Sequence, residues 1–260
     1  GHFTKNITDS AIVLNITAGQ DSYDATTPRV PVPDYAKNLK RGIKGLKIGI
    51  PKEYFIKGLN KEMEKKVKET IKKLEKLGAR LVNISLPHTE YALAVYYIIQ
   101  PSEVSSNLAR YDGIRFGFPR DRFADEAKRR IMLGTYTLSA GYYEAYYFKA
   151  MQVRSLIKKD FDEAFKKVDV LMAPVSPTPP FKLGEKVNDP LQMYLSDIFT
   201  VTANLAGIPG LSIPIGFING LPVGIQILGP QFSEELLFQA GYAYEQATNW
   251  HKRKPVINYD

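Results

Sequence analysis

The sequence predicts an α/β fold in which helices flank a mixed β-sheet. Residues 45–50 and 80–86 have the apolar patterns of strands and enclose a helical pattern, which is a βαβ unit with parallel strands. Residues 211–218 and 221–228 flank the dipeptide Asn219-Gly220, which strongly favours a tight hairpin turn. Parallel and antiparallel strands are therefore both expected, and this combination makes the sheet mixed.

The first half of the chain contains two capped helices. Thr8 or Asp9 can cap a helix that runs to about Ala18, and a loop follows over residues 20–44. Asn60 can cap the helix of the βαβ unit. Its apolar residues recur at helical spacing and are Met63, Val67, Ile71, Leu74 and Leu77.

The remaining segments are mostly helical. Helices are predicted over residues 90–110, 125–132, 139–168 and 194–205, and Ser233 can cap a last helix that runs to about residue 246. Residues 170–173 form a short apolar strand, which Pro174 ends because proline lacks the backbone donor of a sheet.

Composition narrows the class of protein. The 260 residues suit one large domain or two small ones, and the chain has no cysteine, which excludes disulfides, cysteine nucleophiles and thiolate metal sites. No apolar run is long enough to span a membrane. The net charge of +8 lies largely on amphipathic helices such as residues 61–76, where lysine and glutamate alternate, so charge alone identifies no partner.

Common catalytic and metal-binding motifs are absent from the sequence. There is no glycine-rich phosphate loop, and the three histidines, His2, His88 and His251, are far apart and lack the spacing of metal ligands. One S-x-x-K match joins Ser155 to Lys158 inside a helix without its companion motifs, and we interpret it as a coincidence. The motif search therefore identifies no catalytic residue and no metal site in this chain.

Two charged residues lie within apolar helical stretches. Arg130 precedes the run Ile-Met-Leu, and Asp197 lies within Tyr-Leu-Ser-Asp-Ile-Phe. A charge in a mostly buried setting must pair or bind a ligand, because burying it alone costs several kcal/mol. An arginine and an aspartate that face one cavity suit a zwitterion, whereas spacing alone favours a structural salt bridge.

Three long segments resemble a known family. They are residues 102–117 (SEVSSNLARYDGIRFG), 128–143 (KRRIMLGTYTLSAGYY) and 193–214 (MYLSDIFTVTANLAGIPGLSIP). They resemble the A subunits of the glutamyl-tRNA(Gln)/aspartyl-tRNA(Asn) amidotransferases, which are amidase-signature enzymes. The resemblance runs from near Phe3 to about Tyr244.

The resemblance implies an activity and a set of partners. In that family the A subunit hydrolyses glutamine, and the ammonia passes to a B subunit that amidates ATP-activated Glu-tRNA(Gln) or Asp-tRNA(Asn). ATP and magnesium belong to the B subunit, which also makes most of the tRNA contact, and a C subunit completes the heterotrimer. The resemblance further implies a cytoplasmic enzyme that does not bind a membrane.

The family's catalytic serine, cis-serine and lysine lie in two N-terminal segments that this sequence lacks. We therefore expect residues 1–260 to be the C-terminal portion of one amidase-signature domain, inactive alone. Two alternatives remain, another amidase-signature amide hydrolase or a non-catalytic docking fragment.

The resemblance also implies a substrate site. The residues that match Arg130 and Asp197 hold the α-carboxylate and the α-amino group of glutamine in the family, and Tyr96 matches a tyrosine near that pocket. On this basis we favour the ligand role over the structural salt bridge. Between Phe118 and Ala127 the family has a longer loop and helix, so either this loop is naturally short or residues are missing from the sequence.

Overall fold

The computed structural model describes residues 1–186 and 189–255. Its strands are β1 (Lys47–Pro51), β2 (Arg80–Ile84), β3 (Val170–Pro174), β4 (Gly210–Ile218) and β5 (Leu221–Leu228). Its α-helices are α1 (Ile7–Thr17), α2 (Lys61–Lys76), α3 (Ala92–Leu108), α4 (Asp125–Thr137), α5 (Lys149–Phe165), α6 (Pro190–Leu195), α7 (Val201–Ala206) and α8 (Glu234–Gln246). The predicted α/β class is confirmed.

The five strands form one mixed sheet in the order β2-β1-β3-β5-β4. β1 is parallel to both β2 and β3, so the predicted βαβ unit is confirmed. β5 runs antiparallel to β3 and β4. Asn219 and Gly220 have φ values of 50° and 77°, as a tight hairpin turn between β4 and β5 requires.

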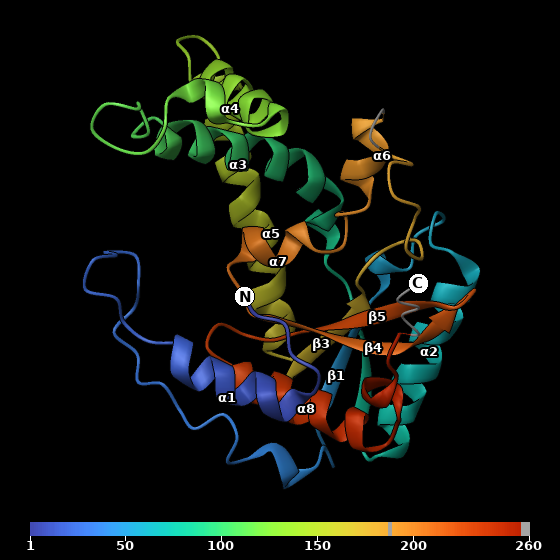
Figure 1. Cartoon of the computed structure of the whole chain (residues 1–260). Coiled ribbons are helices and arrows are strands. Elements are labelled where there is room, and N and C mark those ends of the chain that lie inside the picture. Colours follow the sequence, from blue (N-terminus) through green and yellow to red (C-terminus); the bar gives the residue numbers. More distant parts are fainter. Residues whose placement is uncertain (187–188, 256–260) are drawn as a thin grey trace, which may run out of the picture.

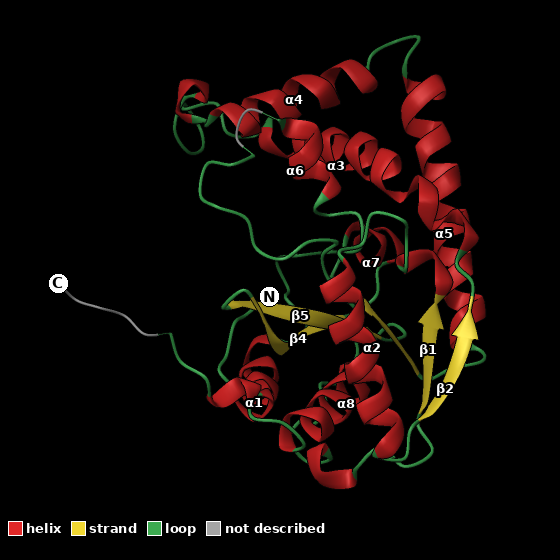
Figure 2. Cartoon of the chain, turned by 90° about the vertical axis from the view of Figure 1, so that its right-hand side faces the viewer, coloured by secondary structure: helices red, strands yellow, loops and turns green. Residues whose placement is uncertain are grey.

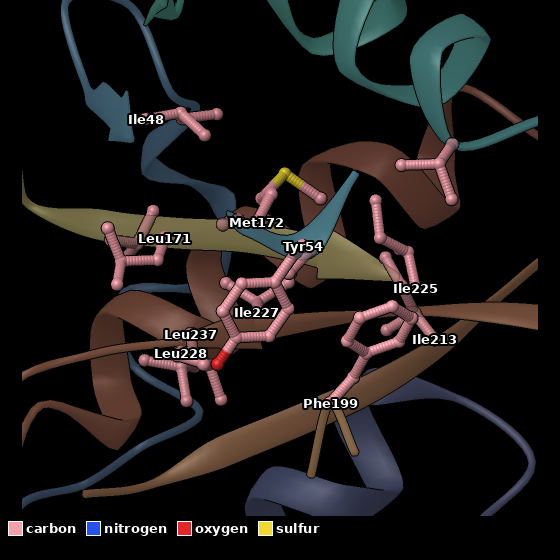
Figure 3. Packing of buried hydrophobic residues seen from close by; sticks show 14 of the residues in the cluster. Ile48, Tyr54, Leu171, Met172, Phe199, Ile213, Ile225, Ile227, Leu228 and Leu237 are labelled. Carbon is pink, nitrogen blue, oxygen red and sulfur yellow. The ribbon is translucent and has the colours of Figure 1, made fainter. Parts of the chain in front are cut away.

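Helices cover both faces of the sheet. α2 and α8 pack on one face of the sheet, with α1 against α8, and α5 and α7 pack together on the other side (Figure 1). α3 and α4 form a separate layer at the far end of α5, with α6 beside them (Figures 1 and 2). All five residues of β3 are buried at the centre of the sheet. Around β3 the core side chains of β1, β4 and β5 interdigitate (Figure 3).

Two predicted caps need correction. α1 begins two to three residues earlier than expected, because Asn6 is its cap and not Thr8 or Asp9. The Asn6 side chain accepts the backbone N–H of Asp9 at 2.7 Å. Ser233 does occupy the cap position of α8, but its hydroxyl donates to the Pro230 carbonyl instead of capping the helix. Asn60 caps α2 as predicted, accepting from the backbone N–H groups of Glu62 and Met63.

Two predicted helices are not continuous α-helices. The segment over residues 139–168 contains a π-helical turn, Tyr143–Phe148, directly before α5. The helix predicted over residues 194–205 is split into α6 and α7 by a turn at residues 196–200. The carbonyl of Phe199 accepts a hydrogen bond from the Gln226 side chain, and Ala203 donates instead to Thr200. A contact with the sheet thus replaces helical bonding at this point.

Candidate functional site

Arg130 lies on α4 in a partly buried setting, with 22% of its side chain exposed. Its Nε donates to Glu126 Oε1 at 2.8 Å and its Nη1 donates to Gln100 Oε1 at 2.7 Å. Burial opposes the charge of Arg130, but the hydrogen bond and charge of Glu126 outweigh it and raise the arginine pKa. The guanidinium is thereby fixed in orientation through Nε and Nη1, while Nη2 carries further N–H groups that can donate to a ligand.

A close contact between α3 and α4 places Arg130 beside Gln100. A Cβ on Gly134 would lie 1.9 Å from the carbonyl oxygen of Pro101, so only glycine permits this approach. The Ser102 and Thr137 hydroxyls hydrogen-bond across the same contact at 2.8 Å. Packing and hydrogen bonding together fix the register of the two helices.

Tyr97 on α3 lies between the two charged residues. Its hydroxyl donates to Asp197 Oδ2 at 3.2 Å, and the Arg130 Cζ lies 5.3 Å from its ring centroid, which is cation–π distance. The Tyr194 ring stacks on the Tyr97 ring at 4.1 Å. Burial and then the charge of Asp197 raise the tyrosine pKa, only partly offset by Arg130, so the hydroxyl stays protonated and able to donate.

Asp197 lies in the turn between α6 and α7. Its carbonyl accepts the backbone N–H groups of Thr200 and Val201 at 2.9 and 3.1 Å, which closes the turn and begins α7. The residue is exposed, so the buried setting expected from its apolar neighbours in sequence is wrong. The helix break turns this position outward, and its carboxylate is accessible to a ligand.

The structure thus brings Arg130 and Asp197 to one site, with Tyr97 as the link between them. Tyr96 packs against the hydrophobic core, and its ring meets the Tyr97 ring edge-on with centroids 5.2 Å apart. Sequence reasoning singled out Tyr96 and missed Tyr97. Helical spacing does not separate these adjacent tyrosines, because Tyr96 and Tyr97 lie four and three residues before Gln100. The observation that separates them is the hydrogen bond from the Tyr97 hydroxyl to Asp197.

Arg130 and Asp197 do not form an ion pair with each other. Among the described residues the salt-bridge partner of Arg130 is Glu126, one helical turn away. A cationic and an anionic group that share a tyrosine between them match the two charges of an amino-acid zwitterion. A guanidinium binds a carboxylate through parallel N–H groups, and a carboxylate accepts from an ammonium.

The other sequence candidates are engaged elsewhere. Ser155 donates to the Met151 carbonyl, and Lys158 pairs with Asp162 at 2.8 Å, so the S-x-x-K residues do not form a nucleophile–base pair. His88 contacts Asp160 through Nδ1 at 2.9 Å. Across the described residues, no cluster of three or more histidine or acidic side chains is arranged to hold a metal ion.

Comparison with known proteins identifies the family to which this chain belongs. The model of the Amidase family matches residues 1–238, so this chain belongs to the amidase family. A bacterial aryl acylamidase of the amidase-signature family, at 22% identity and a TM-score of 0.77, shares the fold.

Several relatives with higher sequence identity are A subunits of glutamyl-tRNA(Gln) amidotransferases. The A subunit of glutamyl-tRNA(Gln) amidotransferase from Thermodesulfovibrio yellowstonii is 56% identical over 99% of this chain, and that from Carboxydothermus hydrogenoformans is 53% identical over the same share. The crystal structure of the A subunit from Thermotoga maritima superimposes with a TM-score of 0.78 at 42% identity, covering 94% of this chain.

The chain spans only part of these proteins. It covers 56% of the length of each of the two relatives and 51% of the Thermotoga maritima chain. The alignment with the first relative extends over 272 positions against the 260 residues of this chain, so that relative carries residues without a counterpart here. No helix among the described residues combines the length and the apolarity needed to cross a membrane.

Proposed function

We propose that this chain is the glutamine-binding portion of the A subunit of a glutamyl-tRNA(Gln) amidotransferase. In this proposal Arg130 holds the α-carboxylate of glutamine, Asp197 holds the α-ammonium group, and Tyr97 aligns both. Tyr96 supports the ring of Tyr97. The similarity to two such A subunits over 99% of the chain supports the assignment of the protein.

The observation that carries the substrate assignment is that Arg130 and Asp197 do not pair with each other. Both contact Tyr97, yet the arginine pairs with Glu126 and not with the aspartate. A purely structural salt bridge would neutralise the two charges against each other. Here the Nη2 group of Arg130 and the carboxylate of Asp197 can still meet a ligand that carries the complementary charges.

The chemistry of the complete enzyme follows from this role. Residues outside this chain cleave the side-chain amide of the bound glutamine, so the chain alone is inactive. The ammonia passes to a B subunit that binds ATP, magnesium and most of the tRNA, and a C subunit completes the complex. No residue of this chain is assigned to ATP or magnesium, and the enzyme works in the cytoplasm.

Arg130→Ala in the complete, assembled enzyme tests the proposal. Losing a charge-assisted contact should raise the KM for glutamine roughly ten- to hundredfold. Amidation supplied with ammonia in place of glutamine should be unchanged, because ammonia bypasses the binding site. Arg129→Ala is the matched control, since Arg129 is the neighbouring residue and also pairs with Glu126 but is 55% exposed.

Two outcomes would contradict the proposal. Equal loss of glutamine-dependent and ammonia-dependent amidation would show that Arg130 supports the fold or the complex and not glutamine binding. An unchanged KM for glutamine, together with hydrolysis of an aryl or fatty amide, would favour a different amide hydrolase of the family, because such an amide has no zwitterionic end.

A further inference from the structure

The turn that carries Asp197 is anchored to the sheet by a buried amide. Gln226 on β5 is only 5% exposed, and its Nε2 donates to two main-chain carbonyls. One is that of Pro174 at 2.9 Å, at the end of β3, and the other is that of Phe199 at 2.7 Å, two residues after Asp197. A single side chain therefore connects the last residue of a central strand to the turn between α6 and α7.

Only a side chain with two N–H groups at this depth can make both bonds. A carboxylate accepts but does not donate, and an apolar side chain would leave two carbonyls without this partner, each at a cost of about 1–3 kcal/mol when buried. The strand pairing does not supply the missing donors, because Gln226 pairs in register with Ala173 and Ser212 rather than with the turn. Its amide is thus a specific support for Phe199.

Tyr54 supports the same turn from a second direction. Its ring stacks on the Phe199 ring with centroids 5.4 Å apart and an interplanar angle of 24°, and Figure 3 shows the two rings side by side. The hydroxyls of Tyr54 and Thr202 hydrogen-bond to each other, which holds the first turn of α7. Phe199 is therefore fixed through its ring and through its carbonyl.

We infer that Gln226 and Tyr54 are positioning residues that set the place of Asp197 opposite Tyr97 and Arg130. The inference rests on the proposed function, in which Asp197 holds the α-ammonium group of glutamine. Neither residue is argued to touch the substrate. Gln226 acts through the Phe199 carbonyl, and Tyr54 acts through the Phe199 ring and the Thr202 hydroxyl. The backbone N–H groups of Asp197, Ile198 and Thr200 bond to carbonyls three residues earlier and do not tie the turn to the sheet.

Gln226→Met in the complete enzyme tests the inference, since methionine is of similar size but donates no hydrogen bond. A displaced carboxylate should raise the KM for glutamine roughly ten- to hundredfold, with ammonia-dependent amidation unchanged. Ile227→Val is the matched control, because it alters the next buried residue of the same strand, whose side chain points to the opposite face of the sheet. It should lower stability slightly and leave the KM as in wild type.

A double-mutant cycle with Asp197→Asn separates positioning from general damage. If Gln226 acts through Asp197, Gln226→Met should add little to the KM of Asp197→Asn, whereas independent effects would multiply. Multiplying effects, or a Gln226→Met enzyme with the KM of the Ile227→Val control, would overturn the inference while Asp197→Asn still raises the KM. An Asp197→Asn enzyme with a normal KM would instead refute the proposed function.

If the enzyme with Gln226→Met does not assemble, Tyr54→Phe tests the inference instead. It keeps the ring on Phe199 and removes only the hydroxyl that contacts Thr202. A severalfold rise in the KM for glutamine that disappears in the Asp197→Asn background would support the inference. An unchanged KM in an enzyme that assembles normally would overturn it.

Discussion

The sheet and the layer of α3, α4 and α6 are organised in different ways. Every residue of β3 is buried, and the strands beside it contribute side chains such as Ile48 and Ile227 that are fully inaccessible to solvent. In the helical layer, by contrast, Met132 and Leu133 of α4 are 73% and 41% exposed. The contacts around Arg130 in this layer include side-chain hydrogen bonds and stacked rings, such as those of Tyr97.

The difference shows where stability and specificity reside. Burial of apolar surface stabilises the sheet by about 25 cal/mol per Å², and this effect does not depend on direction. Hydrogen bonds and cation–π contacts contribute less to stability but fix orientation. We therefore expect substitutions in the sheet to change the free energy of unfolding, and substitutions in the helical layer to change the affinity for substrate.

The largest expected effect tests this contrast with two leucines. Leu171→Ala on β3 opens a cavity at a fully buried position and should lower the free energy of unfolding by about 2–5 kcal/mol. Leu133→Ala on α4 removes the same atoms from a partly exposed position and should change it by less than about 0.5 kcal/mol. Urea denaturation measures both, and equal losses would contradict the contrast.

A glycine substitution should disturb the helical layer at its tightest point. Gly134→Ala places a methyl group against the Pro101 carbonyl and should cost about 1–3 kcal/mol by forcing α3 and α4 apart. Because Arg130 and Gln100 would separate, the KM for glutamine should rise as well. Gly58→Ala is the control, since nothing lies within 4 Å of its Cβ position. A normal KM in Gly134→Ala would show that the helix contact does not position Arg130.

A smaller effect is expected when Tyr97 loses only its hydroxyl. Tyr97→Phe keeps the ring under Arg130 and against Tyr194 but removes the hydrogen bond to Asp197. The KM for glutamine should rise about fivefold, corresponding to about 1 kcal/mol for one hydrogen bond. Tyr96→Phe serves as the control, and a larger effect there than at Tyr97 would restore Tyr96 as the central residue.

The smallest expected effect is the contribution of Glu126 to the free energy of unfolding, which should depend on pH. Despite partial burial, the hydrogen bonds and charges of Arg130 and Arg129 lower the pKa of Glu126 from 4.5. A lowered pKa stabilises the folded state above pH 4.5, and this contribution is lost as pH falls through the folded-state pKa. Because the Glu126 side chain is 46% exposed, its ion pairs should contribute less than about 1 kcal/mol to the free energy of unfolding.

Comparing wild type with Glu126→Gln measures this contribution. The difference in unfolding free energy should be present near neutral pH. It should vanish in acid, where Glu126 is protonated and is uncharged like the glutamine of the variant. A difference that grows as the pH falls would contradict the assigned direction of the pKa shift.

The parts of the fold that sequence predicts are those with local causes. Asn60 caps α2 through its own side chain, and Asn219-Gly220 adopts the backbone angles of the hairpin without help from the rest of the chain. The split between α6 and α7 has a distant cause, because the Phe199 carbonyl is bound by Gln226, which lies 27 residues away. Helical periodicity does not report such a contact.

In the candidate site, too, some features have local causes and others depend on distant contacts. The apolar context of Arg130 and Asp197 singles them out from sequence, but their meeting point depends on how α3 packs against α4 and on where the turn at residues 196–200 lies. Tyr97 becomes distinguishable from Tyr96 only after that packing is known, because the two are adjacent on one helix. Sequence thus identified the charges, and the structure identified the residue between them.

The most direct test of the account compares glutamine with the same molecule lacking its α-amino group. Wild-type enzyme should prefer glutamine by roughly ten- to hundredfold in kcat/KM, the value of one charge-assisted contact. Asp197→Asn keeps an acceptor for the Tyr97 hydroxyl but removes the negative charge, so it should abolish this preference by lowering the value for glutamine alone. A variant that retains the wild-type preference would contradict the claim that Asp197 binds the α-ammonium group.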